Sequence, residues 1–178
     1  MGKRSKFERN PRDYYPTPEE AVLPLLDFVA TRAGCQKTTF IEPCAGDGRL
    51  VRHLTKQGLS CVYACDIEPQ ADFIKKRDVL FFDNTPMPAC DFVITNPPWG
   101  RKLLLPMIEE FRQHAPTWLL IDADFIFTKQ AKQCMSFCHK IVSVGRVSWM
   151  DNGTSGMDNC IWVLFRKEVN YGHTEFYV

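Results

Sequence analysis

The strongest constraint on the fold is the order of short apolar runs along the chain. Five of these runs alternate with segments whose apolar residues recur at the spacing of a helix. Runs this short are typical of parallel strands that are buried on both faces. The alternation therefore predicts an α/β domain, with a mostly parallel sheet and helices on both of its faces.

The ranges of the expected elements follow from the same pattern. We expect strands at 38–41, 61–65, 79–82, 91–95 and 118–121, then two longer strands at 141–149 and 160–165. We expect helices at 18–32, 49–57, 70–75, 102–114 and 129–138, with Thr17 as a cap, a kink at Pro24 and an interruption at Pro106. The last two strands have no helix between them, so they should pair antiparallel at one edge. Residues 171–178 either add an edge strand or stay loose.

Composition excludes several classes of protein. Of the 178 residues, 45% are hydrophobic and 24% are charged, which excludes a disordered, collagenous or coiled-coil chain. No apolar run reaches the roughly 18 residues that cross a membrane, and the first twelve residues lack the apolar stretch of a secretory signal. The eight cysteines show neither a C-x-x-C motif nor paired Cys/His spacing. We therefore expect free thiols in the reducing cytoplasm and no metal site.

Charge is distributed unevenly along the chain. The whole sequence has 22 basic and 21 acidic residues, a net charge of +1. Residues 1–12 hold five basic residues and one acidic residue, so this arm carries +4 and the remainder carries −3. A basic arm can anchor a protein on phosphates, and it can equally be a solvated terminus.

A glycine turn follows the first expected strand. Glu42-Pro43-Cys44-Ala45-Gly46-Asp47-Gly48 joins that strand to a helix, and the two glycines let a ligand approach the backbone closely. The helix behind them offers unpaired N–H groups to a carboxylate or phosphate. The dinucleotide fingerprint needs a third glycine where this chain has Val51, which argues against a nicotinamide dehydrogenase. A purely structural turn remains the alternative.

Acidic residues near this turn have the spacing of a nucleoside site. Asp66 ends the second expected strand, about twenty residues after the glycines, where an acid accepts hydrogen bonds from ribose hydroxyls. A helix cap or a surface acid is the alternative reading of Asp66. Asp78 can accept from an adenine amine, with Ile67 or Val79 packed on the ring. Glu42 faces the same turn, and can hold a ligand's amino group directly or through water.

The tetrapeptide Asn96-Pro97-Pro98-Trp99 is the most specific feature of the sequence. It follows an apolar strand, so it should lie beside the glycine turn at the carboxyl edge of the sheet. The prolines fix the backbone and have no N–H, which leaves carbonyl oxygens to accept hydrogen bonds from an amine. Trp99 offers a face on which a base can stack. These groups suit methylation of a planar NH₂ group, and a rigid loop with a buried Trp is the alternative.

With these motifs, residues 13–167 resemble the class I S-adenosylmethionine-dependent methyltransferases, and specifically their amino-methylating group. Gly46 and its neighbours are similar to the cofactor loop of that family, Asp66 to its ribose acid, and 96–99 to its catalytic motif. Tyr15-Pro16-Thr17-Pro18 resembles the N-terminal segment that helps to hold the methionine end of the cofactor. The resemblance implies a seven-stranded sheet, with the last strand antiparallel. The small size and the glycine turn at 151–156 resemble short phage-type DNA N6-adenine methyltransferases.

From the residues and the resemblance together we expect the following site. The cofactor is S-adenosylmethionine, and its expected binding residues are Tyr15, Thr17, Glu42, Pro43, Cys44, Ala45, Gly46, Gly48, Asp66, Ile67, Asp78, Val79 and Asn96. The expected catalytic residues are Asn96, Pro97, Pro98 and Trp99. The substrate contacts are expected at Trp99, Arg101 and Lys102, together with the basic arm and the 151–158 loop.

The expected activity is methyl transfer to the N6 amine of adenine in DNA. Methylation of adenine in RNA, methylation of a protein glutamine, and cofactor binding without catalysis are the alternatives. Residues 13–178 should form a single domain with no separate target-recognition domain. Target recognition would then rest on shape, on loose specificity or on a partner protein.

Overall fold

A computed structural model describes residues 12, 14–30, 35–80, 86–149, 156 and 158–178. Within these residues, eight strands form one sheet in the order β3-β2-β1-β4-β5-β7-β6-β8. The strands are β1 (Thr39–Glu42), β2 (Ser60–Asp66), β3 (Lys75–Lys76), β4 (Phe92–Thr95), β5 (Thr117–Asp122), β6 (Cys138–Gly145), β7 (Cys160–Phe165) and β8 (Glu175–Tyr177). The helical elements are α1 (Glu19–Val22), η2 (Leu23–Leu25), α2 (Leu26–Val29), α3 (Arg49–Lys56), α4 (Arg101–His114), η3 (Ala123–Phe127) and α5 (Lys132–Met135).

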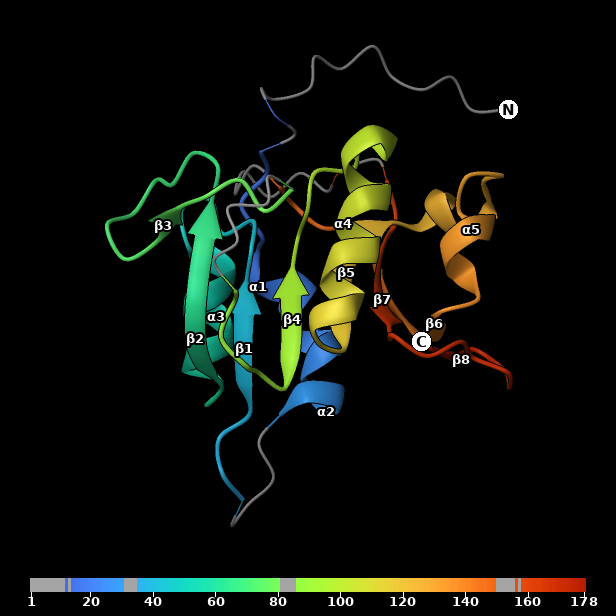
Figure 1. Cartoon of the computed structure of the whole chain (residues 1–178), viewed down its shortest axis with the longest axis horizontal. Coiled ribbons are helices and arrows are strands. Elements are labelled where there is room, and N and C mark those ends of the chain that lie inside the picture. Colours follow the sequence, from blue (N-terminus) through green and yellow to red (C-terminus); the bar gives the residue numbers. More distant parts are fainter. Residues whose placement is uncertain (1–11, 13, 31–34, 81–85, 150–155, 157) are drawn as a thin grey trace.

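The sheet is parallel on one side and antiparallel on the other. Strands β3, β2, β1, β4 and β5 run parallel, whereas β7 pairs antiparallel with both β5 and β6. The predicted fold class is therefore confirmed. The strand count differs from the expected seven, because β8 extends the sheet beyond β6 in parallel pairing. Figure 1 shows the arrowheads of β1, β2 and β4 pointing to the same edge, where their carboxyl ends meet.

Helices cover both faces of this sheet. α4 lies in front of the strands in Figure 1, and α1 to α3 lie behind them. Each layer buries its own apolar cluster: Leu25 and Leu54 belong to the cluster of α1 to α3, and Ile108 and Phe111 to that of α4. Full burial of such side chains contributes about 1.5–3 kcal/mol each. The Trp162 indole N–H donates to the Ala21 carbonyl at 2.7 Å, which fixes α1 on the sheet.

The N-terminal helix is broken at Pro24, as expected. The 3₁₀ turn η2 contains this proline and separates α1 from α2. The helix ends at Val29 rather than at residue 32, and residues 31–34 lie outside the described part. The expected cap at Thr17 is wrong: Pro18 occupies the N-cap position and no side chain caps α1.

Four other expected elements differ from the structure. The strand expected at 141–149 is β6, which begins at Cys138 and ends at Gly145. No helix forms at 70–75, because backbone groups there bond to other parts of the chain. The Gln70 N–H donates to the Gly46 carbonyl in the glycine turn, and β3 pairs with β2. The strand expected at 79–82 is also absent where it is described, since Val79 and Leu80 lie in a turn, and residues 81 and 82 are not described. The helix expected at 129–138 shrinks to α5, because Cys138 already pairs in β6.

The helix α4 continues through Pro106. A proline inside a helix removes one backbone hydrogen bond, which led to the expected interruption. The apolar face of α4 holds the helix together instead, because Leu104, Ile108 and Phe111 are buried against the sheet. Tertiary burial therefore outweighs the local cost of the proline.

Candidate functional site

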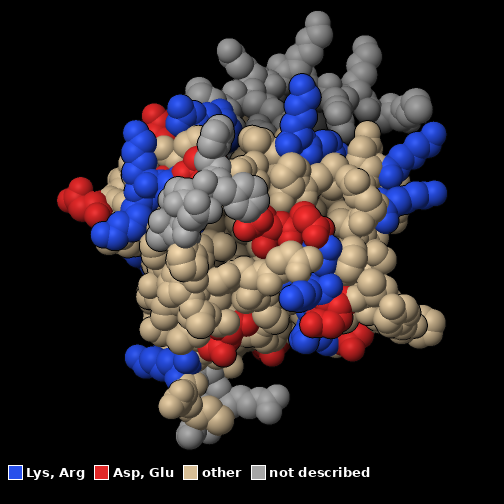
Figure 2. Space-filling view, in the orientation of Figure 1, with Lys and Arg blue, Asp and Glu red and all other residues tan. Residues whose placement is uncertain are grey.

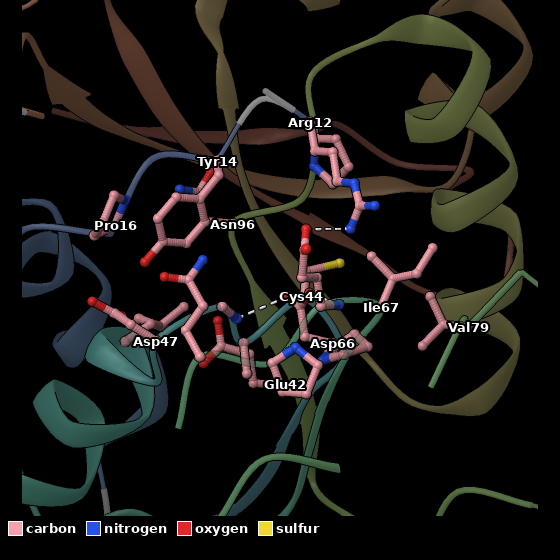
Figure 3. A pocket seen from close by; sticks show the side chains of 18 of the residues that line it. Arg12, Tyr14, Pro16, Glu42, Cys44, Asp47, Asp66, Ile67, Val79 and Asn96 are labelled. Atoms are coloured by element: carbon pink, nitrogen blue, oxygen red, sulfur yellow. Dashed lines mark hydrogen bonds and ion pairs between the residues drawn. The ribbon is translucent and has the colours of Figure 1, made fainter. Parts of the chain in front are cut away.

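A cavity of about 1160 Å³ opens at the carboxyl ends of β1, β2 and β4. It brings together thirteen of the residues expected at the site. They are Tyr15, Thr17, Glu42, Pro43, Cys44, Ala45, Gly46, Asp66, Ile67, Asp78, Val79, Asn96 and Pro98. In Figure 3, Ile67 and Val79 stand toward one side of the pocket, and Tyr14, Asp47 and Asn96 toward the other. Gly48, Pro97, Trp99, Arg101 and Lys102 do not line the cavity.

Backbone geometry explains both glycines of the turn. Gly46 and Gly48 have φ angles of +52° and +78°, which glycine adopts without steric cost. A Cβ atom on Gly46 would lie 2.6 Å from Cε2 of Tyr14, whose ring packs on this turn. A Cβ atom on Gly48 would lie 2.3 Å from Cζ of Phe73. Gly48 therefore makes room for Phe73 and starts α3, whereas Gly46 lies in the cavity wall.

Asp66 ties the glycine turn to the end of β2. Its Oδ2 accepts the Gly46 N–H at 2.8 Å, and its Oδ1 accepts the Glu68 N–H at 2.7 Å. No helix follows Asp66 among the described residues of this segment, so a helix-capping role is wrong. Each carboxylate oxygen keeps a second lone pair for a further donor. The side chain is thus fixed in place at the cavity and can still accept hydrogen bonds from a ligand.

Glu42 is a buried carboxyl group on the last residue of β1. Only 1% of its surface is exposed, and Oε2 has no hydrogen-bond partner among the described residues. Burial raises the pKa of Glu42 well above its ordinary value, and the negative charges of Asp66 and Asp47 raise it further. A backbone hydrogen bond from Val51 opposes this rise in pKa. An unpartnered acceptor in such a position suits a positively charged donor from a ligand.

Apolar side chains form the other end of the cavity. Ile67 is half exposed there, and Val79 lies across the same space. Asp78 accepts the Leu80 N–H at 3.0 Å, which holds this turn and keeps its second carboxylate oxygen available. This end of the cavity therefore offers an apolar surface beside a hydrogen-bond acceptor.

Asn96 is fixed by the N-terminal segment. Its Nδ2 donates to the Tyr15 carbonyl at 3.1 Å and to the Thr17 hydroxyl at 3.3 Å. Both amide hydrogens are therefore used, and Oδ1 is left as an acceptor. Pro97 is buried beneath this position, and Pro98 lines the cavity.

Trp99 is anchored beside the cavity. Its indole N–H donates to the Leu120 carbonyl of β5 at 3.1 Å, and its ring meets the edge of Trp149 at 5.7 Å between centroids. Tyr15 meets the same Trp149 ring at 6.1 Å. The three aromatic rings form a cluster that joins the tetrapeptide, the N-terminal segment and the chain after β6.

Arg12 and Tyr14 are among the cavity-lining residues that the sequence reasoning did not assign to the cofactor site. We call Arg12 and residues 14–17 the strap, since they run along the cavity wall. Arg12 forms an ion pair with Glu68. The Tyr14 ring packs on Gly46; burial raises its pKa, and the nearby Asp47 raises it further. No motif distinguishes Tyr14 from other tyrosines, because its partner Gly46 lies 32 residues away and only folding brings the two together.

Basic side chains stand on the rim of the same sheet edge. The Arg101 guanidinium lies 4.9 Å from the centre of the Phe125 ring, and Lys102 is exposed. Figure 2 shows Lys and Arg side chains gathered where α4 begins and beside α5. Of the other expected substrate contacts, residues 1–11 lie outside the described part, and only Gly156 and Asp158 of the 151–158 loop are described.

Two further searches cover the described residues. No cluster of three or more His, Cys, Asp or Glu side chains there has the geometry to hold a metal ion. No described helix has the length and apolar character needed to span a membrane.

Comparison with known proteins gives one related sequence. The chain is 29% identical to the Type II methyltransferase M.VspI of Vibrio sp. (strain 343), over an alignment that covers 56% of this chain and 28% of the relative. The alignment thus covers less than a third of the relative's length. No protein-family model matches the chain.

Solved structures show the fold. A protein of Pyrococcus horikoshii described as a candidate RNA methyltransferase matches with a TM-score of 0.64 at 15% identity, over 93% of this chain and 95% of that one. The methyltransferase subunit of a type I restriction-modification system from Streptococcus thermophilus matches with a TM-score of 0.56 at 14% identity, over 86% of this chain and 45% of that one. The chain therefore has the Rossmann-like fold of class I methyltransferases.

Proposed function

We propose that this chain transfers a methyl group from S-adenosylmethionine to the exocyclic N6 amine of adenine in DNA. The orientation of Asn96 is the observation on which the proposal rests. Because both of its amide hydrogens are bound by the strap, Oδ1 is left to accept a hydrogen bond from a substrate NH₂ group. An acceptor fixed before the substrate arrives lowers the cost of positioning the reacting nitrogen.

The cavity fits the proposed cofactor. The orphaned Oε2 of the buried Glu42 would accept from the ammonium group of the methionine moiety. Asp66 would accept from the ribose hydroxyls, Ile67 and Val79 would pack on the adenine ring, and Asp78 would accept from its amine. When bound, S-adenosylmethionine supplies an electrophilic methyl group on a sulfonium sulfur.

The tetrapeptide would act on the substrate amine. Oδ1 of Asn96 and the Pro97 carbonyl would accept its two hydrogens, which draws the nitrogen lone pair out of conjugation with the ring. Trp99 would stack on the target base, a contact worth about 1–3 kcal/mol. Its anchor on Leu120 would keep that face in a fixed position.

Nucleic acid is the favoured substrate class. The relative M.VspI is a type II methyltransferase, and one structural neighbour is a restriction-modification subunit. Arg101 and Lys102 would add attraction for phosphates at the rim. RNA is a second candidate, because another structural neighbour is described as an RNA methyltransferase. Protein glutamine is a third candidate, since the same tetrapeptide suits an amide nitrogen. For a nucleic-acid substrate, a partner protein would supply target recognition.

Nucleoside mass spectrometry tests the proposal. The chain is incubated with methyl-deuterated S-adenosylmethionine and with single-stranded DNA, double-stranded DNA, RNA or a protein extract. We expect deuterated N6-methyldeoxyadenosine from the wild type and none from Asn96→Ala. Gln57→Ala is the matched control, because it also removes a carboxamide, is exposed, and follows the end of α3 farthest from the glycine turn.

The distribution of label decides between the substrates. Label in RNA adenine alone, or in glutamine alone, would overturn the DNA assignment and keep the methyl transfer. Binding of the cofactor without label in any substrate would contradict the enzymatic proposal. Equal labelling by wild type and Asn96→Ala would contradict the role given to Asn96.

A further inference from the structure

Within the described residues, the hydrogen bonds of the Asn96 carboxamide all go to one side. Its two amide hydrogens point to the strap, where the Tyr15 carbonyl and the Thr17 hydroxyl accept them. The side chain has a rotatable terminal amide, so either its oxygen or its nitrogen could face the cavity. The strap decides between these two orientations.

The strap has a sequence that favours one orientation. Pro16 and Pro18 flank Thr17 and have no N–H to donate to the oxygen of a flipped amide. The Thr17 hydroxyl can donate as well as accept, so the Tyr15 carbonyl, which only accepts, is the group that selects the orientation. A flipped Asn96 would also place Oδ1 against the Tyr15 carbonyl oxygen, and two acceptors repel each other. Pro18 has the extended angles φ −74° and ψ 154°. The prolines thus stiffen the segment that presents the two acceptors.

Contacts at several points hold the strap against the cavity. Arg12 pairs with Glu68, the Tyr14 ring packs on Gly46, and Tyr15 meets Trp149 edge to face. Thr17 is itself 4% exposed. Its hydroxyl is therefore a buried polar group that accepts from Asn96 and does not cap α1.

We propose that Thr17 is a positioning residue for the methyl transfer, in addition to its expected place beside the cofactor. Its hydroxyl fixes the position of the Asn96 amide, which the Tyr15 carbonyl orients with its oxygen toward the substrate amine. This inference rests on the proposed function. It predicts that Thr17 acts mainly on the chemical step, through Asn96, and only weakly on cofactor affinity.

Isosteric substitution separates these effects. Thr17→Val keeps the size and the branched Cβ and removes the hydroxyl, whereas Thr17→Ser keeps the hydroxyl. We expect kcat at saturating cofactor to fall about tenfold in Thr17→Val, the effect of losing one neutral hydrogen bond in the positioning of Asn96. Thr17→Ser should restore most of kcat. Thr55→Val is the control, because that hydroxyl only bonds the backbone of its own helix.

Two readouts accompany the kinetics. Calorimetric titration with S-adenosylhomocysteine gives the Kd of each variant, and it should change less than threefold. The side-chain amide signals of Asn96 are assigned in ¹⁵N NMR spectra by comparison with Asn96→Asp. They report the hydrogen bonds of the carboxamide and need no catalytic turnover. We expect its two ¹H signals to shift and its hydrogen exchange to accelerate in Thr17→Val, and to stay near wild type in Thr17→Ser and Thr55→Val.

The outcomes distinguish failure of the inference from failure of the proposed function. A weakened Kd with unchanged kcat would overturn the positioning role and leave Thr17 as a cofactor contact. An unchanged Asn96 amide signal in Thr17→Val would overturn it as well. If the wild type methylates no adenine, the proposed function fails, and the NMR comparison still decides whether Thr17 orients Asn96.

Discussion

Replacing Glu42 with Gln should stabilise the free protein and weaken its binding of S-adenosylmethionine. Glu42 is 1% exposed, and in the described part of the chain its Oε2 has no hydrogen-bond partner. Glutamine has nearly the same shape and no charge, so it removes the cost of a buried, poorly compensated anion. The same change removes the charge that we propose for the ammonium group of the cofactor.

The pH dependence has a definite sign. The pKa of Glu42 in the folded chain is raised, chiefly by burial, above the value that it has in the unfolded chain. The folded state therefore binds more protons between these two pKa values, and its stability falls as the pH rises from about 4.5 through the folded pKa. In Glu42→Gln this position does not titrate, so it adds no pH dependence to the free energy of unfolding. The two proteins should match in stability below about pH 4.5 and diverge above it.

Magnitudes follow from the chemistry of the site. A buried polar group without a partner costs about 1–3 kcal/mol, and a charged one costs more. Glutamine keeps a polar group at this position and removes only the charge, so we expect Glu42→Gln to gain about 2 kcal/mol at pH 8 from the loss of the charge. A charge-assisted hydrogen bond contributes about 1.5–3 kcal/mol, so cofactor affinity should fall by about 10- to 100-fold.

Urea denaturation at several pH values and calorimetric titration measure the two effects. Gln57→Ala serves as a surface control that should change neither quantity. A Glu42→Gln protein that is less stable than wild type at pH 8 would refute the reasoning on burial. Unchanged cofactor affinity would refute the proposed contact with the ammonium group.

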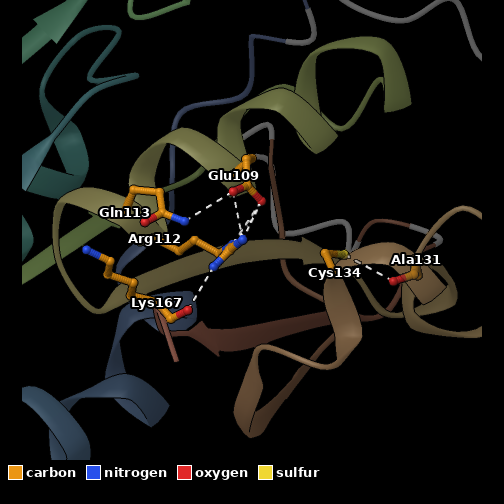
Figure 4. A network of polar contacts seen from close by, with 6 residues as sticks. All are labelled: Glu109, Arg112, Gln113, Ala131, Cys134 and Lys167. Atoms are coloured by element: carbon orange, nitrogen blue, oxygen red, sulfur yellow. Dashed lines mark hydrogen bonds and ion pairs between the residues drawn. The ribbon is translucent and has the colours of Figure 1, made fainter. Parts of the chain in front are cut away.

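Two further predictions concern the turn and the helix α4. Gly46→Ala should lose about 1 kcal/mol of stability, because alanine is strained at φ +52°. The variant should also bind the cofactor at least tenfold more weakly, because its Cβ displaces Tyr14 and the strap. Gly58→Ala, at φ +90° with open space around it, should lose stability alone, and equal cofactor affinity in the two variants would contradict this prediction. The buried Arg112 guanidinium bonds Glu109 and the Lys167 carbonyl (Figure 4), and it lies 3.5 Å from the centre of the Phe137 ring. Arg112→Ala should therefore lower the free energy of unfolding in urea by about 2–4 kcal/mol. The exposed Arg166→Ala is its control, and similar losses in both variants would contradict the role given to burial.

Local patterns predicted the elements that are long or strongly apolar. The ranges of β1, β2, β4, β5, β7 and α3 match expectation to within a residue or two, and the antiparallel pairing of β6 with β7 is confirmed. The errors at 70–75 and 129–138 have a common cause. In both segments backbone groups pair with distant strands, and such pairing leaves no periodic signal in the sequence.

The sequence by itself determined the class of fold and brought the residues of the candidate site together at one edge of the sheet. Strands, glycine turn and tetrapeptide appear in an order that puts Glu42, Asp66 and Asn96 at one edge of a parallel sheet, because the carboxyl ends of parallel strands meet there. Only the tertiary structure decided which way Asn96 faces. Its partners Tyr15 and Thr17 lie 81 and 79 residues earlier in the chain, and hydrogen bonds over such distances exist only once the sheet has formed.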